Sequence, residues 1–220
     1  MSYYLNLSVL SNNQNDRQKK SDRSKLLSAE ARRILSLCEG RPITDDDIAR
    51  EASGRPFFPC LDTDFSISHS GALAAVSLVR GKNLRTGCDV ELVRPRKRAR
   101  EIAREFFTPQ ERKYIESDTR PDGTRFYQIW TLKECFLKLH GLSVFDMIGV
   151  PSFVNGEGSL LNTGLNQISF NLYEFIGNDE ERYIVATALQ GGEECQPEIR
   201  WFSKNFPELS TTNHTNTTNF

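Results

Sequence analysis

A chain of 220 residues, 38% of them hydrophobic and 14 of them phenylalanine, suits one domain or a compact unit of two lobes and excludes global disorder. The formal net charge of -1 excludes a globally basic nucleic-acid binder. No apolar run approaches the roughly 18 residues that span a membrane, and residues 1–10 lack the features of a secretory signal. Because the five cysteines form no CxxC pair, we expect free thiols in a cytoplasmic protein.

The first half of the chain alternates between strand and helix signals. Residues 3–10 predict a strand, and apolar residues at helical spacing predict a helix or helix pair over residues 18–38. A short helix is expected from Thr44 to Ala52, followed by a turn at residues 54–56. Further on, the patterns predict a short strand over residues 65–68 and a β-hairpin over residues 72–92.

The second half begins with a basic stretch and contains one long helix. Residues 94–107 become helical, the sequence Thr108-Pro109-Gln110-Glu111 predicts the start of another helix, and a long helix is expected over residues 125–140, ending at Gly141. Alternating segments predict strands of a second sheet at residues 153–154, 160–161, 167–175 and 182–189. We therefore expect an α+β fold with an N-terminal subdomain (residues 1–86), a C-terminal subdomain carrying the site (residues 87–206) and a flexible tail (residues 207–220).

Two acids near the middle of the chain are candidates for a metal site. In a strand, Asp89 and Glu91 point to one face, while Cys88 and Val90 point the opposite way into a core. Taken alone, such a pair is more often a solvent-facing edge. However, the preceding Gly87 permits close backbone approach, and carboxylate oxygens suit a hard cation such as Mg²⁺.

The long helix supplies a third acid and a lysine. Because residues four apart share a helix face, Trp130, Glu134 and Lys138 stand one above another. Glu followed four residues later by Lys is commonly an exposed ion pair. Apolar residues nearly encircle this helix, so we expect burial, and buried charges need partners or a metal. Three carboxylates with a lysine then suggest a divalent-metal phosphate site.

Other polar residues suit phosphate contacts or protein docking. Ser68 and His69 precede a glycine and suit phosphate binding better than a Ser–His relay, since adjacent strand residues face opposite ways. Arg55, held in a proline turn, suits bidentate phosphate contact. The basic cluster from Arg94 to Arg104 is either a solvated face or a docking strip for an acidic protein, and nucleic-acid binding fits it less well.

The motifs together closely resemble the signature of the 4'-phosphopantetheinyl transferase superfamily. They read GCDVE at residues 87–91, REFF-TPQE at 104–111 and WTLKECFLK at 130–138, with GRP at 54–56 and FSISHSG at 65–71 upstream. The resemblance spans roughly residues 23–141 and is to the larger, surfactin-synthetase-activating-like type, which serves fatty-acid, polyketide and nonribosomal peptide biosynthesis. It implies a pseudo-dimer of two related α+β subdomains with coenzyme A in the cleft between them.

The same resemblance implies the reaction and its residues. Phosphopantetheine would pass from coenzyme A to a serine of an apo acyl or peptidyl carrier protein, releasing 3',5'-ADP. Asp89, Glu91 and Glu134 would hold Mg²⁺, and Lys138 would contact the pyrophosphate. The coenzyme A phosphates would be bound by Arg23, Ser24, Arg55, Ser68 and His69. Either Glu134 or a metal-bound water would be the general base.

One departure from the family pattern and one alternative function remain open. The segment before Arg23 lacks the usual spacing of basic residues, so neither Lys19 nor Lys20 is assigned to the 3'-phosphate. We expect a monomer with an acidic carrier as partner and with neither nucleic acid nor membrane. The alternative is a catalytically inactive coenzyme A-binding or carrier-docking protein, against which the intact acid cluster argues.

Overall fold

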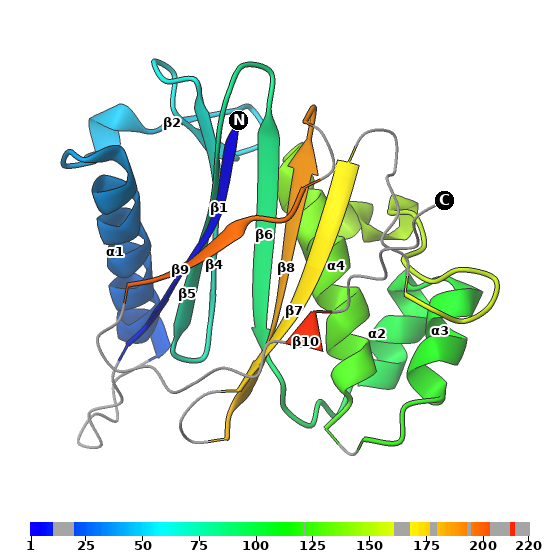
Figure 1. Cartoon of the computed structure of the whole chain (residues 1–220). Coiled ribbons are helices and arrows are strands. Elements are labelled where there is room, and N and C mark those ends of the chain that lie inside the picture. Colours follow the sequence, from blue (N-terminus) through cyan, green and yellow to red (C-terminus); the bar gives the residue numbers. More distant parts are fainter. Residues whose placement is uncertain are drawn as a thin grey trace.

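Two four-stranded sheets lie between helices in the structure, a computed structural model that describes residues 1–10, 20–120, 122–160, 168–176, 180–192, 195–202 and 212–213, without the side chains of 20–23 and 212–213 (Figure 1). The first sheet has the order β4 (Thr63–Ser70), β5 (Leu73–Arg80), β1 (Ser2–Val9) and β9 (Glu198–Trp201). The second has the order β10 (Thr212–Asn213), β7 (Ile168–Ile176), β8 (Arg182–Gln190) and β6 (Arg85–Leu92). A small ribbon pairs β2 (Ala49–Arg50) with β3 (Pro56–Phe57).

Helices cover the outer faces of this arrangement. Helix α1 (Lys20–Glu39) packs on the first sheet, and α4 (Thr124–His140) packs on the second, with α2 (Ala99–Phe106) and α3 (Pro109–Glu116) beyond it (Figure 1). One turn of 3-10 helix, η1, spans Asp45–Asp47, and a longer 3-10 helix, η2, spans Val144–Gly149. No helix in the described part of the chain is long and apolar enough to cross a membrane.

Strand alternation directs the apolar side chains of these layers into separate hydrophobic clusters. On β5, Val76 and Leu78 face α1, whereas Leu73 and Ala75 face the second sheet. Between the sheets the core includes Leu5 and Leu7 from β1, Cys88 and Val90 from β6, and Tyr183 and Val185 from β8. Since successive strand residues face opposite sides, the other face of β6 is the one that α4 covers.

The long helix and its end match the prediction from the sequence. Eleven of the 17 residues of α4 are buried, and the chain leaves the helix at Gly141, whose φ of +67° favours glycine. The start of α3 is also confirmed, because Thr108 and Glu111 form a capping box with Pro109 at the first turn. The structure is a mixed α+β fold, as expected.

The predicted hairpin over residues 72–92 is wrong. Strand β5 pairs with β4, through a turn at Gly71, and with β1, while β6 pairs with β8 in the other sheet. Both edges of β5 are therefore occupied, and residues 81–84 lead the chain out of the first sheet. The short helix expected to end near Ala52 is also wrong in length, because η1 is followed at once by β2.

The proposed division of the chain stays a prediction. Strand β6 begins at Arg85, next to the expected boundary, but β9 returns to the first sheet and pairs in parallel with β1. Of the expected tail, most of residues 207–220 lies outside the described residues, and Thr212–Asn213 pairs with β7. The expected strands near 153 and 160 form an isolated bridge between Val154 and Leu160.

Candidate active site

The two strand acids lie on the face of β6 that α4 covers. Asp89 is 4% exposed, and its neighbours Cys88 and Val90 are buried on the opposite face, as the alternation predicts. A Cβ atom at Gly87 would lie 2.6 Å from the carbonyl oxygen of Cys135. Glycine at this position therefore lets α4 approach β6 closely, which confirms the role expected for it.

Helix α4 brings Glu134 and Lys138 to these acids. Lys138 Nζ lies 2.7 Å from Asp89 Oδ1 and donates to Ser68 Oγ at 2.8 Å. Burial and, to a smaller extent, the charges of Asp89 and Glu91 raise the pKa of Glu134 to about 7, although the nearby Lys138 opposes this shift. Glu134 therefore lies near enough to Asp89 and Glu91 for their charges to act on its pKa.

The carboxylate of Glu91 is held at both oxygens. Trp130 Nε1 donates to Oε1 at 3.0 Å, and Ser70 Oγ donates to Oε2 at 3.3 Å. Burial raises the pKa of Glu91, and the charge of Asp89 adds to that effect. The two donors come from α4 and β4, so Glu91 is oriented from both sides of the boundary between the sheets.

Side chains of β4 take the place of a hydrogen-bonded strand beside β6. Thr86 N donates to Asp64 Oδ2 at 2.8 Å, Val90 N donates to Ser68 Oγ at 3.2 Å, and Leu92 N donates to Ser70 Oγ at 3.0 Å. Every pair is 22 residues apart, so the strands run parallel here. These three edge amides of β6 are thereby satisfied, as buried backbone donors must be.

Ser68 is the meeting point of this boundary and the acid cluster. Its hydroxyl donates to Asp89 Oδ1 at 2.8 Å and accepts from Lys138 Nζ and from Val90 N. A hydroxyl has one donor and two acceptor positions, so Ser68 Oγ is fully engaged. A phosphate would have to displace one of these partners to contact it.

The donor set of the site fits a hard divalent cation. Asp89 Oδ2 is buried and has no hydrogen-bond partner among the described residues, although a buried carboxylate oxygen normally has one. Three mutually repelling carboxylates also gain from a shared cation. In the described part of the chain, no three His, Cys, Asp or Glu side chains already lie in a metal-holding arrangement, and Lys138 neutralises Asp89 instead.

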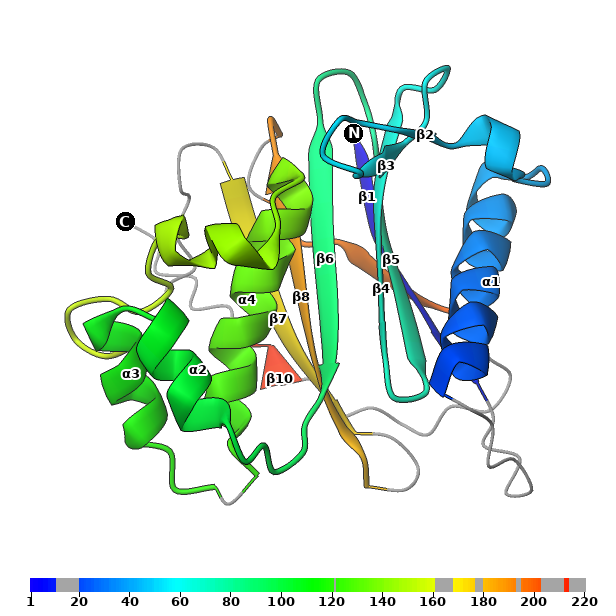
Figure 2. The ribbon, with the colours of Figure 1, turned by 180° about the vertical axis from the view of Figure 1, so that it is seen from behind.

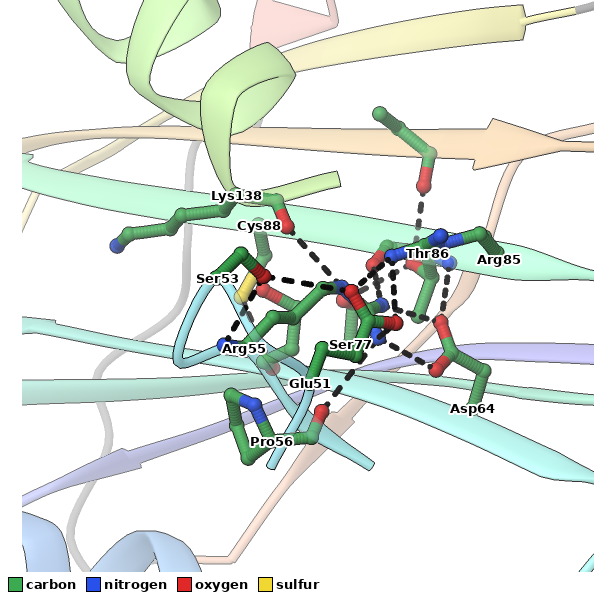
Figure 3. Close-up of polar contacts among 12 residues, drawn as sticks. Glu51, Ser53, Arg55, Pro56, Asp64, Ser77, Arg85, Thr86, Cys88 and Lys138 are labelled. Carbon is green, nitrogen blue, oxygen red and sulfur yellow. Dashed lines mark hydrogen bonds and ion pairs between the residues drawn. The ribbon is translucent and has the colours of Figure 1, made fainter. Parts of the chain in front are cut away.

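The remaining candidates for phosphate binding differ in how near they lie to the acids. His69 is half-buried, and burial lowers its pKa, with the charge of Lys138 adding to the shift. Ser24 is exposed on α1, whereas the side chain of Arg23 and all of Lys19 lie outside the described residues, as does the side chain of Lys20. Arg55 is buried among protein acceptors and reaches the backbone of Lys138 rather than the acid cluster (Figure 3).

The structure also shows contacts at the site that the sequence did not predict. Ser70 and Trp130 hold Glu91, but no local sequence pattern predicts either hydrogen bond. Lys133 is the fully buried charge of α4: its Nζ lies 3.2 Å from Glu111 Oε2, and both side chains are 0% exposed. The encircling apolar residues predicted a buried helix, but burial falls on Lys133, whereas Lys138 keeps a side chain that is 32% exposed.

The basic strip from Arg94 to Arg104 is only partly free. Arg96 lies over the ring of Trp130 at 5.0 Å and over that of Phe126 at 5.6 Å, and Arg98 pairs with Glu101. Arg96 therefore packs directly behind the residue that holds Glu91, which links the strip to the site.

The chain is similar to proteins of one enzyme superfamily. It is 32% identical over 107 residues to 4'-phosphopantetheinyl transferase AcpT of Salmonella typhi, covering 48% of this chain and 54% of that relative. It is 31% identical over 119 residues to AcpT of Escherichia coli (strain K12), covering 53% and 60%, and 31% identical over 122 residues to 4'-phosphopantetheinyl transferase Sfp of Bacillus subtilis (strain 168), covering 53% and 52%. The chain thus spans about half the length of the curated relatives it matches. Residues 85–188, which include Asp89, Glu91, Glu134 and Lys138, match the family model of the 4'-phosphopantetheinyl transferase superfamily.

Proposed function

We propose that this protein transfers 4'-phosphopantetheine from coenzyme A to a serine of an apo acyl or peptidyl carrier protein in a Mg²⁺-dependent reaction. The observation that carries the proposal is the ion pair between Lys138 of α4 and Asp89 of β6, with Glu134 near enough for the charges of both strand acids to act on its pKa, all within the matched residues. Such a group of acids is costly to bury without a cation to balance its charge.

Asp89, Glu91 and Glu134 would hold the metal, which when bound would neutralise charge on the pyrophosphate of coenzyme A. The partnerless Asp89 Oδ2 offers one oxygen for it. Trp130 and Ser70 keep Glu91 in one orientation before substrate arrives. Preset ligands reduce the cost of reorganisation when charge develops.

Lys138 would move from Asp89 to the pyrophosphate, since a cation at the acids makes its present contact redundant. Ser68 would turn its hydroxyl from Asp89 to a phosphate oxygen, with His69, Arg23 and Ser24 as further ligands. A cavity of about 220 Å³ adjoins Lys138 and is lined from both halves of the chain, by Ser66 and Ile67 of β4 and by Gly141 and Leu142 after α4. It supports a coenzyme A site between two related subdomains.

In the transfer itself, the serine oxygen of the carrier forms a bond to the phosphorus that bears the pantetheine group. The bond from that phosphorus to the bridging oxygen breaks, and 3',5'-ADP leaves. Either Glu134 or a water held at the acid site would take the serine proton as the general base.

Mass spectrometry tests the proposal directly. Purified protein, coenzyme A, Mg²⁺ and a panel of apo carriers from fatty-acid, polyketide and peptide synthesis should yield carriers bearing one phosphopantetheine each. Glu91→Gln and Glu134→Gln should abolish the product. If no carrier is modified although coenzyme A binds, the protein is instead an inactive coenzyme A-binding or carrier-docking protein.

Two finer parts of the proposal concern type and partner. The larger, surfactin-synthetase-activating-like type would be supported by modification of peptidyl as well as acyl carriers in that panel. The carrier would dock its acidic surface on the strip from Arg94 to Arg104, and the protein would act as a monomer in the cytoplasm.

A further inference from the structure

Arg55 uses every donor of its guanidinium within the protein. Nε donates to the backbone oxygen of Lys138 at 3.1 Å, Nη1 donates to Asp64 Oδ1 at 2.9 Å and to Pro56 O at 3.4 Å, and Nη2 donates to Asp64 Oδ2 at 2.5 Å and to Thr86 O at 3.0 Å (Figure 3). A guanidinium has five N–H groups, so none remains for a ligand. The Arg55 side chain is 5% exposed.

These bonds join parts of the chain that are far apart in sequence. Arg55 lies in the turn between β2 and β3, and Asp64 lies on β4. Thr86 is the second residue of β6, and Lys138 lies in the last turn of α4. Figure 2 shows the β2–β3 ribbon at the same end of the molecule as the C-terminal end of α4. One side chain thus ties the first sheet, the second sheet and the helix together.

The contact with Lys138 falls where a cation is most favourable. The last carbonyl groups of a helix lack intrahelical partners and carry partial negative charge, so a cation is stabilising there. The bond also fixes the backbone of the residue whose Nζ reaches Asp89. Asp64, in turn, is bound by both Nη atoms of Arg55 and by Thr86 N.

We infer that Arg55 and Asp64 are positioning residues that hold the C-terminal end of α4 against β4 and β6, rather than ligands of coenzyme A phosphates. This pair sets the backbone of Lys138 relative to Asp89 and so fixes the distance that the lysine spans to the pyrophosphate. The effect on turnover rests on the proposed function, whereas the effect on the helix end does not.

Lysine at position 55 would not reproduce the arrangement. An ammonium group has three donors on one nitrogen, whereas the planar fork of Arg55 reaches acceptors on three sides at once. Asp64→Asn keeps the shape of its side chain but removes the charge and one acceptor. The two conservative variants therefore test the same ion pair by changing each of its two members in turn.

The experiment compares Arg55→Lys, Asp64→Asn and the double variant, with Arg85→Lys as the matched control. Arg85 lies beside this ion pair and pairs with Glu51, but its side chain is 37% exposed and makes no contact with Lys138 among the described residues. For each protein, amide hydrogen exchange at Gly141 and Leu142 is measured without substrate, coenzyme A affinity by calorimetry, and kcat and KM with a carrier.

Arg55→Lys and Asp64→Asn should each speed exchange at the helix end and lower kcat by about tenfold or more, because small misplacement of a reacting group is costly. Coenzyme A affinity should change less than about threefold, and the double variant should be no worse than either single one. The control should match the unmodified protein in every measurement.

The inference is overturned if Arg55→Lys weakens coenzyme A binding tenfold or more, in a salt-dependent way, while Asp64→Asn binds it normally. It is equally overturned if both variants exchange at the helix end like the unmodified protein. If no protein transfers phosphopantetheine but the exchange result holds, the proposed function fails and the role of Arg55 in holding α4 stands.

Discussion

Trp130 Nε1 donates a hydrogen bond of 3.0 Å to Glu91 Oε1, so the helix that carries Glu134 also orients an acid on the strand below it. The indole packs against Phe126, with ring centroids 6.0 Å apart, and the guanidinium of Arg96 lies over both rings. Packing therefore supports the orientation of the indole, and Glu91 receives a donor whose place does not depend on substrate.

Trp130→Phe should weaken Mg²⁺ binding without unfolding the protein. Phenylalanine retains aromatic packing but has no N–H, and loss of a partner that orients a metal ligand typically costs about 10- to 100-fold in affinity. Titration calorimetry with Mg²⁺ measures the change, and Trp201→Phe is the control for loss of an indole elsewhere. Unchanged Mg²⁺ affinity in Trp130→Phe would show that the hydrogen bond does not preset a metal ligand.

Removing only one partner of the buried pair Lys133–Glu111 should strongly destabilise the protein. Glu111 also accepts from Thr108 N at 2.9 Å and from Phe153 N at 3.0 Å, and Lys133 donates to Val150 O. Lys133→Met leaves a buried carboxylate without its cation and should lower the free energy of unfolding by about 3–5 kcal/mol.

Urea unfolding tests this, with Glu111→Gln and the double variant completing a cycle. The double variant should cost clearly less than the sum of the single ones, since neither charge is then left alone. Removing the exposed pair member Arg98 should change the unfolding midpoint little. Additive single effects would show that the two charges do not stabilise one another.

Gly87→Ala should destabilise the protein and disturb the site together. The added Cβ would lie 2.6 Å from Cys135 O and 3.0 Å from Leu139 Cβ, and a helix backbone cannot yield as a flexible side chain can. Overpacking of this kind typically costs about 1–3 kcal/mol. Thermal unfolding measures the loss, and Gly156→Ala, where nothing lies within 4 Å, is the control. Equal melting temperatures for the two variants would contradict the close approach of α4 to β6.

The metal-free protein should lose stability as the pH rises past the ordinary pKa of Glu134. The folded pKa of about 7 exceeds the ordinary 4.5, so the folded state holds a proton that the unfolded state has already released between these values. The free energy of unfolding should therefore fall from pH 4.5 through 7, by on the order of 1–3 kcal/mol.

Chemical unfolding at several pH values, in the presence of a chelator, measures this slope, and Glu134→Gln should flatten it. Mg²⁺ should stabilise the protein more at pH 8 than at pH 5.5, because binding requires the ionised carboxylate. A slope of the same size in Glu134→Gln would assign the effect to another group.

Charge reversal on the basic strip should weaken only the interaction with the carrier protein. Arg100→Glu with Arg104→Glu should raise the carrier KM several-fold and leave coenzyme A affinity unchanged, since α2 lies outside the acid cluster. Steady-state kinetics with both substrates separate the two effects. An unchanged carrier KM would remove the strip as a docking surface.

Much of the site could be predicted because its residues sit in regular local patterns. Alternation along residues 87–91 placed Asp89 and Glu91 on one face of a strand. The spacing of four residues placed Glu134 and Lys138 on one face of a helix, and both orientations are confirmed. The hairpin prediction failed because the local sequence of an apolar strand does not determine which other strand it pairs with. Arg55 was expected at a phosphate, yet its five acceptors come from residues up to 83 positions away.

The sequence by itself determined which side chains share a face of each element, because the periods of helix and strand are properties of the local backbone. Only the tertiary structure decided that α4 lies over β6, that Ser70 and Trp130 hydrogen-bond to Glu91, and that Lys133 rather than Lys138 is the fully buried charge. These outcomes depend on packing between segments distant in the chain. A hydrogen bond between such segments is set by how the layers meet and leaves no trace in local spacing.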